Sequence, residues 1–187
     1  SDIPLNRVYK WTEEDSISTY LEPSGYTAAA TRAGEPGSNG LLLDPHGRLV
    51  LCQHGDRRVA WMDAPLDKPA AVFVTLAADF KGKRLNSPND AIYSSKGDLY
   101  FTDPPYGLEK QMDDSAKELD FQGVYRLSSS GNIELMTKEL SRPNGIGLSP
   151  DEKTLYVANS DPDWAVWMAY DVKEDGHIEK GRVFYDA

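Results

Sequence analysis

The sequence predicts an all-β fold, and within that class a partial β-propeller of roughly three to four blades. A unit of short apolar strands separated by polar turns recurs along the chain, each complete repeat opens on an asparagine, and each has room for four strands. Asn39, Asn89 and Asn144 open the three complete units and stand 50 and 55 residues apart. Four strands in about 40–50 residues is the period of a propeller blade.

The first half of each unit reads as a hairpin. The asparagine is followed by a small or acidic residue, a short apolar strand, a polar turn and a second apolar strand. These halves cover residues 39–51, 89–101 and 144–157. Third strands are predicted at 58–62, 123–127 and 166–170, and fourth strands at 71–74, 133–136 and 182–185.

Residues 1–11 match the turn and third strand of a further unit whose front half is absent. We therefore expect a single propeller domain over residues 1–187, truncated at both ends. Its units are a partial one near 1–38, followed by 39–88, 89–143 and 144–187. Residues 112–119 interrupt the strand pattern and predict a long loop, and very little helix is expected.

The net charge of −10 argues against a nucleic-acid or anionic-membrane partner, and it suits a protein that holds a cation. No apolar run approaches the roughly 20 residues of a membrane span. The single cysteine, Cys52, excludes an internal disulfide. We expect a soluble protein, cytoplasmic or periplasmic. A homo-oligomer is compatible with the sequence.

The recurrent asparagines predict a site. The first strand of every propeller blade lines the central channel. Asn39, Asn89 and Asn144 stand at equivalent positions of their units, so their side chains would converge at one mouth of that channel. Amide oxygens are hard ligands that suit Ca²⁺, with Mg²⁺ and Mn²⁺ as alternatives, whereas Zn²⁺ favours His or Cys. The competing interpretation is a set of turn residues, because Asn-Gly and Asn-Asp are common turn pairs.

Other catalytic patterns are missing. The chain has no Gly-x-Ser-x-Gly elbow and no glycine-rich phosphate loop. The three histidines have no zinc-site spacing. Residues 171–176 imitate the front of an EF-hand loop, but Lys173 and Arg182 fall where ligands are needed, which favours a hairpin turn.

Four stretches, residues 1–11, 52–58, 82–90 with 100–107, and 142–160, carry a family resemblance. With them the chain resembles the gluconolactonase and senescence-marker-protein family of six-bladed, calcium-dependent propellers, and in particular its bacterial gluconolactonase branch. The resemblance implies one divalent cation (Ca²⁺, or another such as Mg²⁺, Mn²⁺ or Zn²⁺) held by a Glu, two Asn and an Asp. The two asparagines fall on Asn89, in Ser-Pro-Asn-Asp, and Asn144, in Pro-Asn-Gly. The Glu is expected before residue 1, and the Asp, the expected general base, beyond residue 187.

The resemblance also implies metal-dependent hydrolysis of a sugar lactone, with the cation polarising the lactone carbonyl. Asn39 is then expected to bond substrate hydroxyls, His54 to stand beside it on a loop, and Tyr106 to form an apolar wall. Asp103 and Arg84 complete the expected substrate-binding set. A structural histidine, a loop-fixing hydrogen bond and a solvated charge are the respective alternatives for His54, Asp103 and Arg84.

Three tryptophans, Trp61, Trp164 and Trp167, are expected to pack between blades. Two other functions fit the same pattern. One is a phosphotriesterase-like or arylesterase-like hydrolase on the same propeller, and the other is a non-enzymatic calcium-binding propeller.

Overall fold

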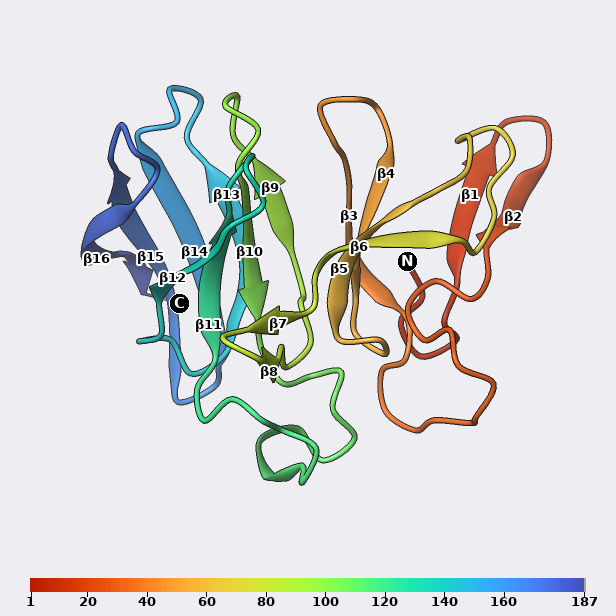
Figure 1. Cartoon of the computed structure of the whole chain (residues 1–187), viewed down its shortest axis with the longest axis horizontal. Helices are drawn as coiled ribbons and strands as arrows, with labels where there is room; N and C mark the ends of the chain where they lie inside the picture. Colours follow the sequence, from red (N-terminus) through yellow and green to blue (C-terminus); the bar gives the residue numbers. More distant parts are fainter. Residues whose placement is uncertain (187) are drawn as a thin grey trace.

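The computed structural model describes residues 1–186, and the fold is all-β (Figure 1). Three four-stranded antiparallel sheets follow one another along the chain, and within each the strands lie side by side in sequence order. The prediction of a partial β-propeller is confirmed. In the described part of the chain, helix is limited to one 3₁₀ turn, η1 (Gln111–Asp113), which overlaps the start of the loop predicted at 112–119.

The first four-stranded sheet begins at the first asparagine of the repeat. It comprises β3 (Ser38–Leu43), β4 (Leu49–Gln53), β5 (Arg58–Met62) and β6 (Phe73–Ala77). The predicted third strand coincides with β5, whereas the fourth starts two residues later than predicted. A turn closed by the bond from the Val72 N–H to the Ala70 carbonyl, 2.8 Å, occupies those two residues.

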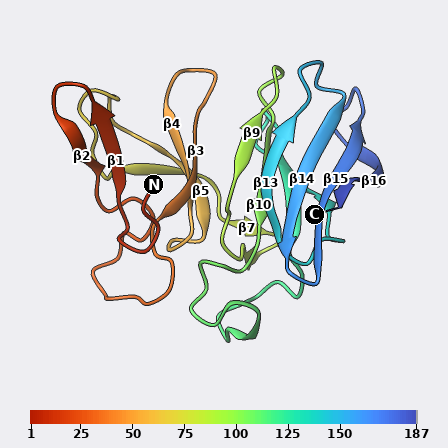
Figure 2. The same ribbon diagram turned by 180° about the vertical axis from the view of Figure 1, so that it is seen from behind.

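The other two sheets repeat this order. The second comprises β9 (Ala91–Tyr93), β10 (Leu99–Asp103), β11 (Gly123–Leu127) and β12 (Ile133–Thr137). The third comprises β13 (Pro143–Leu148), β14 (Thr154–Asp161), β15 (Trp164–Val172) and β16 (Ile178–Asp186). Figure 2 shows β9 and β13 adjacent, as they also are in Figure 1.

Two smaller pairs complete the strands. β1 (Val8–Thr12) and β2 (Ser16–Leu21) form an antiparallel hairpin ahead of the first sheet, where one strand was predicted. β7 (Asp79–Phe80) and β8 (Lys83–Arg84) form a short hairpin between the first and second sheets. The division of the chain into one domain with these blade boundaries stays a prediction.

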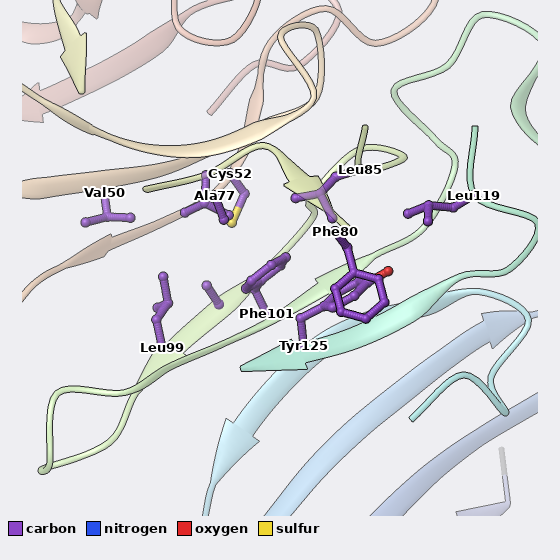
Figure 3. Packing of buried hydrophobic residues seen from close by; sticks show 11 residues of the cluster. Val50, Cys52, Ala77, Phe80, Leu85, Leu99, Phe101, Leu119 and Tyr125 are labelled. Carbon is purple, nitrogen blue, oxygen red and sulfur yellow. The ribbon is translucent and has the colours of Figure 1, made fainter. Parts of the chain in front are cut away.

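The core lies between neighbouring sheets, and the central strands β4 and β10 are buried on both faces. Side chains alternate across a strand, so β4 turns Val50 and Cys52 toward the second sheet and Leu51 toward the β1–β2 hairpin. The second sheet contributes Phe101 and Tyr125 to the same cluster, and their rings stack at 5.3 Å between centroids (Figure 3). Burying one such large apolar side chain contributes about 1.5–3 kcal/mol. This two-sided burial explains why β4 reads as a nearly continuous apolar run.

The tryptophans divide into two groups. Trp61 packs against the cluster between the first and second sheets, as predicted, and the guanidinium of Arg48 lies 4.0 Å from its ring centroid. Trp164 and Trp167 are 40% and 50% exposed, so the prediction that they pack between blades is wrong for the described structure. Both lie on β15 of the last sheet, and no further sheet among residues 1–186 covers them.

Two long loops mark one end of the sheets. Residues 22–37 join β2 to β3 and residues 104–122 join β10 to β11, and both extend at the lower end of the molecule in Figure 1. We call this end, where β3, β9 and β13 begin, the mouth. In residues 1–186 no helix has the length and apolar character needed to cross a bilayer.

Candidate functional site

The three repeated asparagines lie together at the mouth. The N–H of Gly40, which follows Asn39, donates to the carbonyl of Asn89 over 2.7 Å. The N–H of Asn89 donates to the carbonyl of Thr102 over 2.9 Å, and the Thr102 hydroxyl donates to the carbonyl of Asn144 over 2.6 Å. One hydrogen-bonded track therefore connects the openings of the three innermost strands and brings the asparagines to the same end.

Asn89 is almost completely enclosed, with 2% of its surface exposed. Its amide nitrogen Nδ2 lies 3.3 Å from Nε2 of His54, which follows β4. An amide nitrogen only donates, so Nε2 must be the acceptor and the proton of the neutral imidazole belongs on Nδ1. Among residues 1–186 no hydrogen bond reaches Oδ1 of Asn89.

His54 itself is fully buried. Its Nδ1 atom lies 3.2 Å from Oε2 of Glu35, on the loop before β3. The contact is close but lacks hydrogen-bond geometry, and the Glu35 side chain is 41% exposed. With no exposed surface, the His54 ring reaches the mouth through Asn89 rather than directly.

Asn144 is held by a second arrangement. Its Nδ2 donates to the hydroxyl of Ser160 over 3.1 Å, and the same hydroxyl bonds the phenol of Tyr106. Ser160 also directs its hydroxyl toward the carbonyl of Arg142 at 3.4 Å. A hydroxyl has one donor and two acceptor positions. Since Nδ2 can only donate, Ser160 accepts from Asn144, whereas either oxygen of the Ser160–Tyr106 pair can be the donor. Oδ1 of Asn144 has no hydrogen bond among the described residues.

Two uncommitted amide oxygens are therefore present at one mouth. Neutral amide oxygens are hard ligands that fit part of the 6–8 oxygen set of Ca²⁺. No group of three or more His, Cys, Asp or Glu residues capable of holding a metal occurs within residues 1–186. The chemistry of Asn89 and Asn144 thus fits a contribution of two ligands to an oxygen-coordinated cation.

Asp103 lies beneath the mouth and is fully buried. Its two carboxylate oxygens accept the backbone N–H groups of Asn86 and Ser87, both at 2.8 Å. Burial raises the pKa of Asp103 to about 7, while the two N–H donors and the Arg57 guanidinium act to lower it. In this position the carboxyl shapes the loop that leads to Asn89, and it has no exposed surface to offer a substrate.

Arg84 and Asn39 occupy different parts of this end. Arg84 lies on β8, where its guanidinium donates to the carbonyl of Asp56 over 3.0 Å, and it lines a cavity with Arg32 and Arg57 outside the asparagine track. Asn39 is half-buried at the start of β3, and no hydrogen bond to its side chain is present in residues 1–186. Asn39 is thus available at the mouth, and Arg84 stands further out. The substrate-binding roles of both stay predictions.

Two residues of the site had no signal in the sequence pattern. Ser160 lies three residues beyond the hairpin predicted at 144–157, and Glu35 stands in the segment Gly34-Glu35-Pro36-Gly37, which has no periodicity. Each matters only through a contact with a residue distant in sequence: Ser160 with Asn144 and Glu35 with His54.

The chain is similar in sequence and in fold to several known proteins. The profile of the SMP-30/Gluconolactonase/LRE-like region matches residues 1–187. A gluconolactonase of Zymomonas mobilis subsp. mobilis is 45% identical over 163 residues, which make up 86% of this chain and 45% of that protein.

Two solved structures superpose over the whole chain. One, named only provisionally as a gluconolactonase, matches with a TM-score of 0.82 at 28% identity, and the chain covers 59% of it. The other, a gluconolactonase of Xanthomonas campestris, matches with a TM-score of 0.80 at 32% identity and 58% coverage. The chain spans less than two thirds of the length of each of these relatives.

Proposed function

The chain belongs to the SMP-30/gluconolactonase/LRE-like family, and on that premise we propose that its protein is a gluconolactonase-like hydrolase that opens a sugar lactone. The observation that carries the proposal is the pair of asparagines, Asn89 and Asn144, whose amide nitrogens are both occupied and whose oxygens are both free at one mouth. Identity of 45% to the Zymomonas gluconolactonase supports the choice of a lactone as substrate.

A divalent cation, Ca²⁺ in our proposal, would supply positive charge that polarises the lactone carbonyl and stabilises the oxyanion. Asn89 and Asn144 would hold it through their amide oxygens. Asn39, half-buried with an uncommitted side chain, bonds a hydroxyl of the sugar. Tyr106 covers one side of the ring from the loop after β10, where its phenol is fixed on Ser160.

The test is a substrate panel with the full-length protein, measured with and without divalent cations. We expect opening of glucono-1,5-lactone, followed as acid release, to exceed turnover of a phosphotriester and of an aryl ester, and to be abolished by chelator. Asn144→Ala removes one ligand. Because charge stabilisation by a metal is worth several kcal/mol, the variant should lose at least about 100-fold in kcat/KM.

The outcomes separate the alternatives. Preferential turnover of the phosphotriester or aryl ester would indicate a hydrolase of a different substrate class that uses the same site. Calcium binding with no turnover of any member of the panel would indicate a non-enzymatic calcium-binding propeller. Unchanged lactone turnover in Asn144→Ala, with stability kept, would remove Asn144 from the reaction.

A further inference from the structure

We infer that His54 and Ser160 are positioning residues: each binds the amide nitrogen of one asparagine, and each thereby turns that asparagine's oxygen into the mouth. The inference deepens the proposed function, since it rests on Asn89 and Asn144 holding a cation. It assigns His54 a role through Asn89 in place of direct contact with the substrate, and it gives a role to Ser160, which had none.

The need for such residues follows from the shape of an amide. The oxygen and nitrogen ends of an asparagine side chain are nearly the same size, and the terminal torsion is broad, so packing alone does not choose between them. Only the oxygen can bind a cation, whereas the NH₂ group repels it. Hydrogen-bonding neighbours therefore have to determine which end of Asn89 and of Asn144 faces the mouth.

At Asn89 the choice is made by a chain of three side chains. Glu35 stands 3.2 Å from Nδ1 of His54, which favours the tautomer with the proton on Nδ1. That tautomer leaves a lone pair on Nε2, 3.3 Å from Nδ2 of Asn89. Because His54 is fully buried, no water competes for this lone pair. The nitrogen of Asn89 is bound from behind, and its oxygen points the other way.

At Asn144 the choice is made by a hydroxyl. Ser160 lies on β14, the strand paired with the β13 strand that carries Asn144. Its hydroxyl lies 3.4 Å from the carbonyl of Arg142 and bonds the phenol of Tyr106, where either oxygen can be the donor. With either direction of that bond, the Ser160 oxygen keeps an acceptor position for Nδ2 of Asn144, 3.1 Å away.

Two unrelated chemistries on two different sheets thus lead to the same result. An imidazole following β4 and a hydroxyl on β14 each accept from an amide nitrogen, and neither donates to an amide oxygen. A purely structural role for His54 would require only that its ring atoms be satisfied. It would not require that the same end of both asparagines be left free.

The first experiment measures the dissociation constant for Ca²⁺ by calorimetric titration of the metal-free, full-length protein. His54→Leu keeps approximate volume but removes the acceptor, and the Kd should rise about 10- to 100-fold, the usual cost of losing a partner behind a metal ligand. His54→Gln restores an acceptor at the Nε2 position and should bring the Kd back toward the wild-type value. His46→Leu is the control, since His46 is exposed on the turn between β3 and β4, away from the mouth.

The second experiment applies the same titration to Ser160, the hydrogen-bond partner of Asn144. Ser160→Ala should raise the Kd for Ca²⁺ by about tenfold or more, and Ser160→Thr, which keeps the hydroxyl, should not. Ser130→Ala, in the exposed turn between β11 and β12, is the matched control. Glu35→Ala should reproduce part of the His54→Leu effect. Because Glu35 lies on the surface, this variant tests the contacts from Glu35 through His54 to Asn89 even if His54→Leu does not fold.

The outcomes are distinct. Wild-type-like Kd values in His54→Leu and Ser160→Ala, accompanied only by a lower melting temperature of the metal-free protein, would overturn the inference and leave the proposed function standing. Equal Kd values for His54→Leu and His54→Gln would overturn the positioning role of His54 toward Asn89. If the wild-type protein itself binds no Ca²⁺, Mg²⁺ or Mn²⁺, the metal site of the proposed function fails, and the inference fails with it.

Discussion

The backbone N–H of Gly40 donates to the carbonyl of Asn89 over 2.7 Å, and this bond joins the innermost strand of the first sheet to the opening of the second. The approach is possible because residue 40 has no side chain. A Cβ atom there would lie 2.8 Å from the Asn89 carbonyl oxygen and 2.9 Å from both Cα and Oδ1 of Asp90. In the first Asn-Gly pair of the repeat, Asn39-Gly40, the glycine is therefore needed for close contact between the first and second sheets.

Gly40→Ala should destabilise the protein and loosen the mouth together. Forcing a methyl group against fixed backbone costs about 1–3 kcal/mol, and the strain falls on the backbone of Asn89. The free energy of unfolding in urea measures the first effect, and the Kd for Ca²⁺ measures the second. Gly147→Ala is the matched control, because Gly147 also lies on an innermost strand but a Cβ there meets no atom within 4 Å. Equal behaviour of the two variants would contradict the close-approach explanation.

Gly107 provides a similar test on the other side of the site. A Cβ at residue 107 would stand 2.6 Å from the Cβ atoms of both His54 and Ser87. Gly107→Ala should therefore push His54 away from Asn89. Since a displacement of about 1 Å at a catalytic site costs about 100-fold in rate, kcat/KM for the lactone should fall by one to two orders of magnitude. Activity close to that of wild type would show that the Gly107 loop, and not His54, yields to the methyl group.

How far the sequence predicts this molecule depends on the kind of signal each part carries. Residues 58–62 and 123–127 were predicted as strands, and β5 and β11 have those bounds, because each is an apolar run set off by turn residues. Residues 182–185 fall inside the longer β16, since pairing with β15 extends the strand beyond its apolar part. In these cases local pattern and tertiary structure agree.

The site divides in the same way. Asn89 and Asn144 recur in register, so the period alone indicates that they share a mouth. Glu35 and Ser160 act through single contacts that span 19 and 16 residues, and nothing in the local sequence marks those pairings. Asp103 was identified as a candidate from its loop, but burial decides what it does, and burial of a carboxylate against the Asn86–Ser87 loop is a tertiary property.

Asp103 should give the protein a distinctive pH dependence. Burial raises its pKa from 3.8 to about 7, so the folded state binds a proton that the unfolded state has released between those values. The contribution of this group to the free energy of unfolding is therefore fully present below pH 3.8, falls as the pH rises through about 7, and then levels off. Urea denaturation from pH 5 to 8 should show this decline in the wild-type protein relative to Asp103→Asn. Parallel curves for the two proteins would mean that the carboxyl is ionised throughout, held by its two N–H donors.

Variants at Tyr106 distinguish substrate binding by its ring from positioning of Ser160 by its phenol. Its ring is proposed to cover the sugar, and its phenol bonds Ser160. A ring covering one face of a ligand contributes about 0.8–1.5 kcal/mol, half the value for a fully buried side chain. Tyr106→Ala should therefore raise KM for the lactone about tenfold with little change in kcat. Tyr106→Phe keeps the ring and loses only the bond to Ser160, so its KM should stay near the wild-type value while the Kd for Ca²⁺ rises by a smaller factor than in Ser160→Ala. A KM in Tyr106→Phe as high as in Tyr106→Ala would place the substrate contact on the hydroxyl and remove the apolar wall from the site.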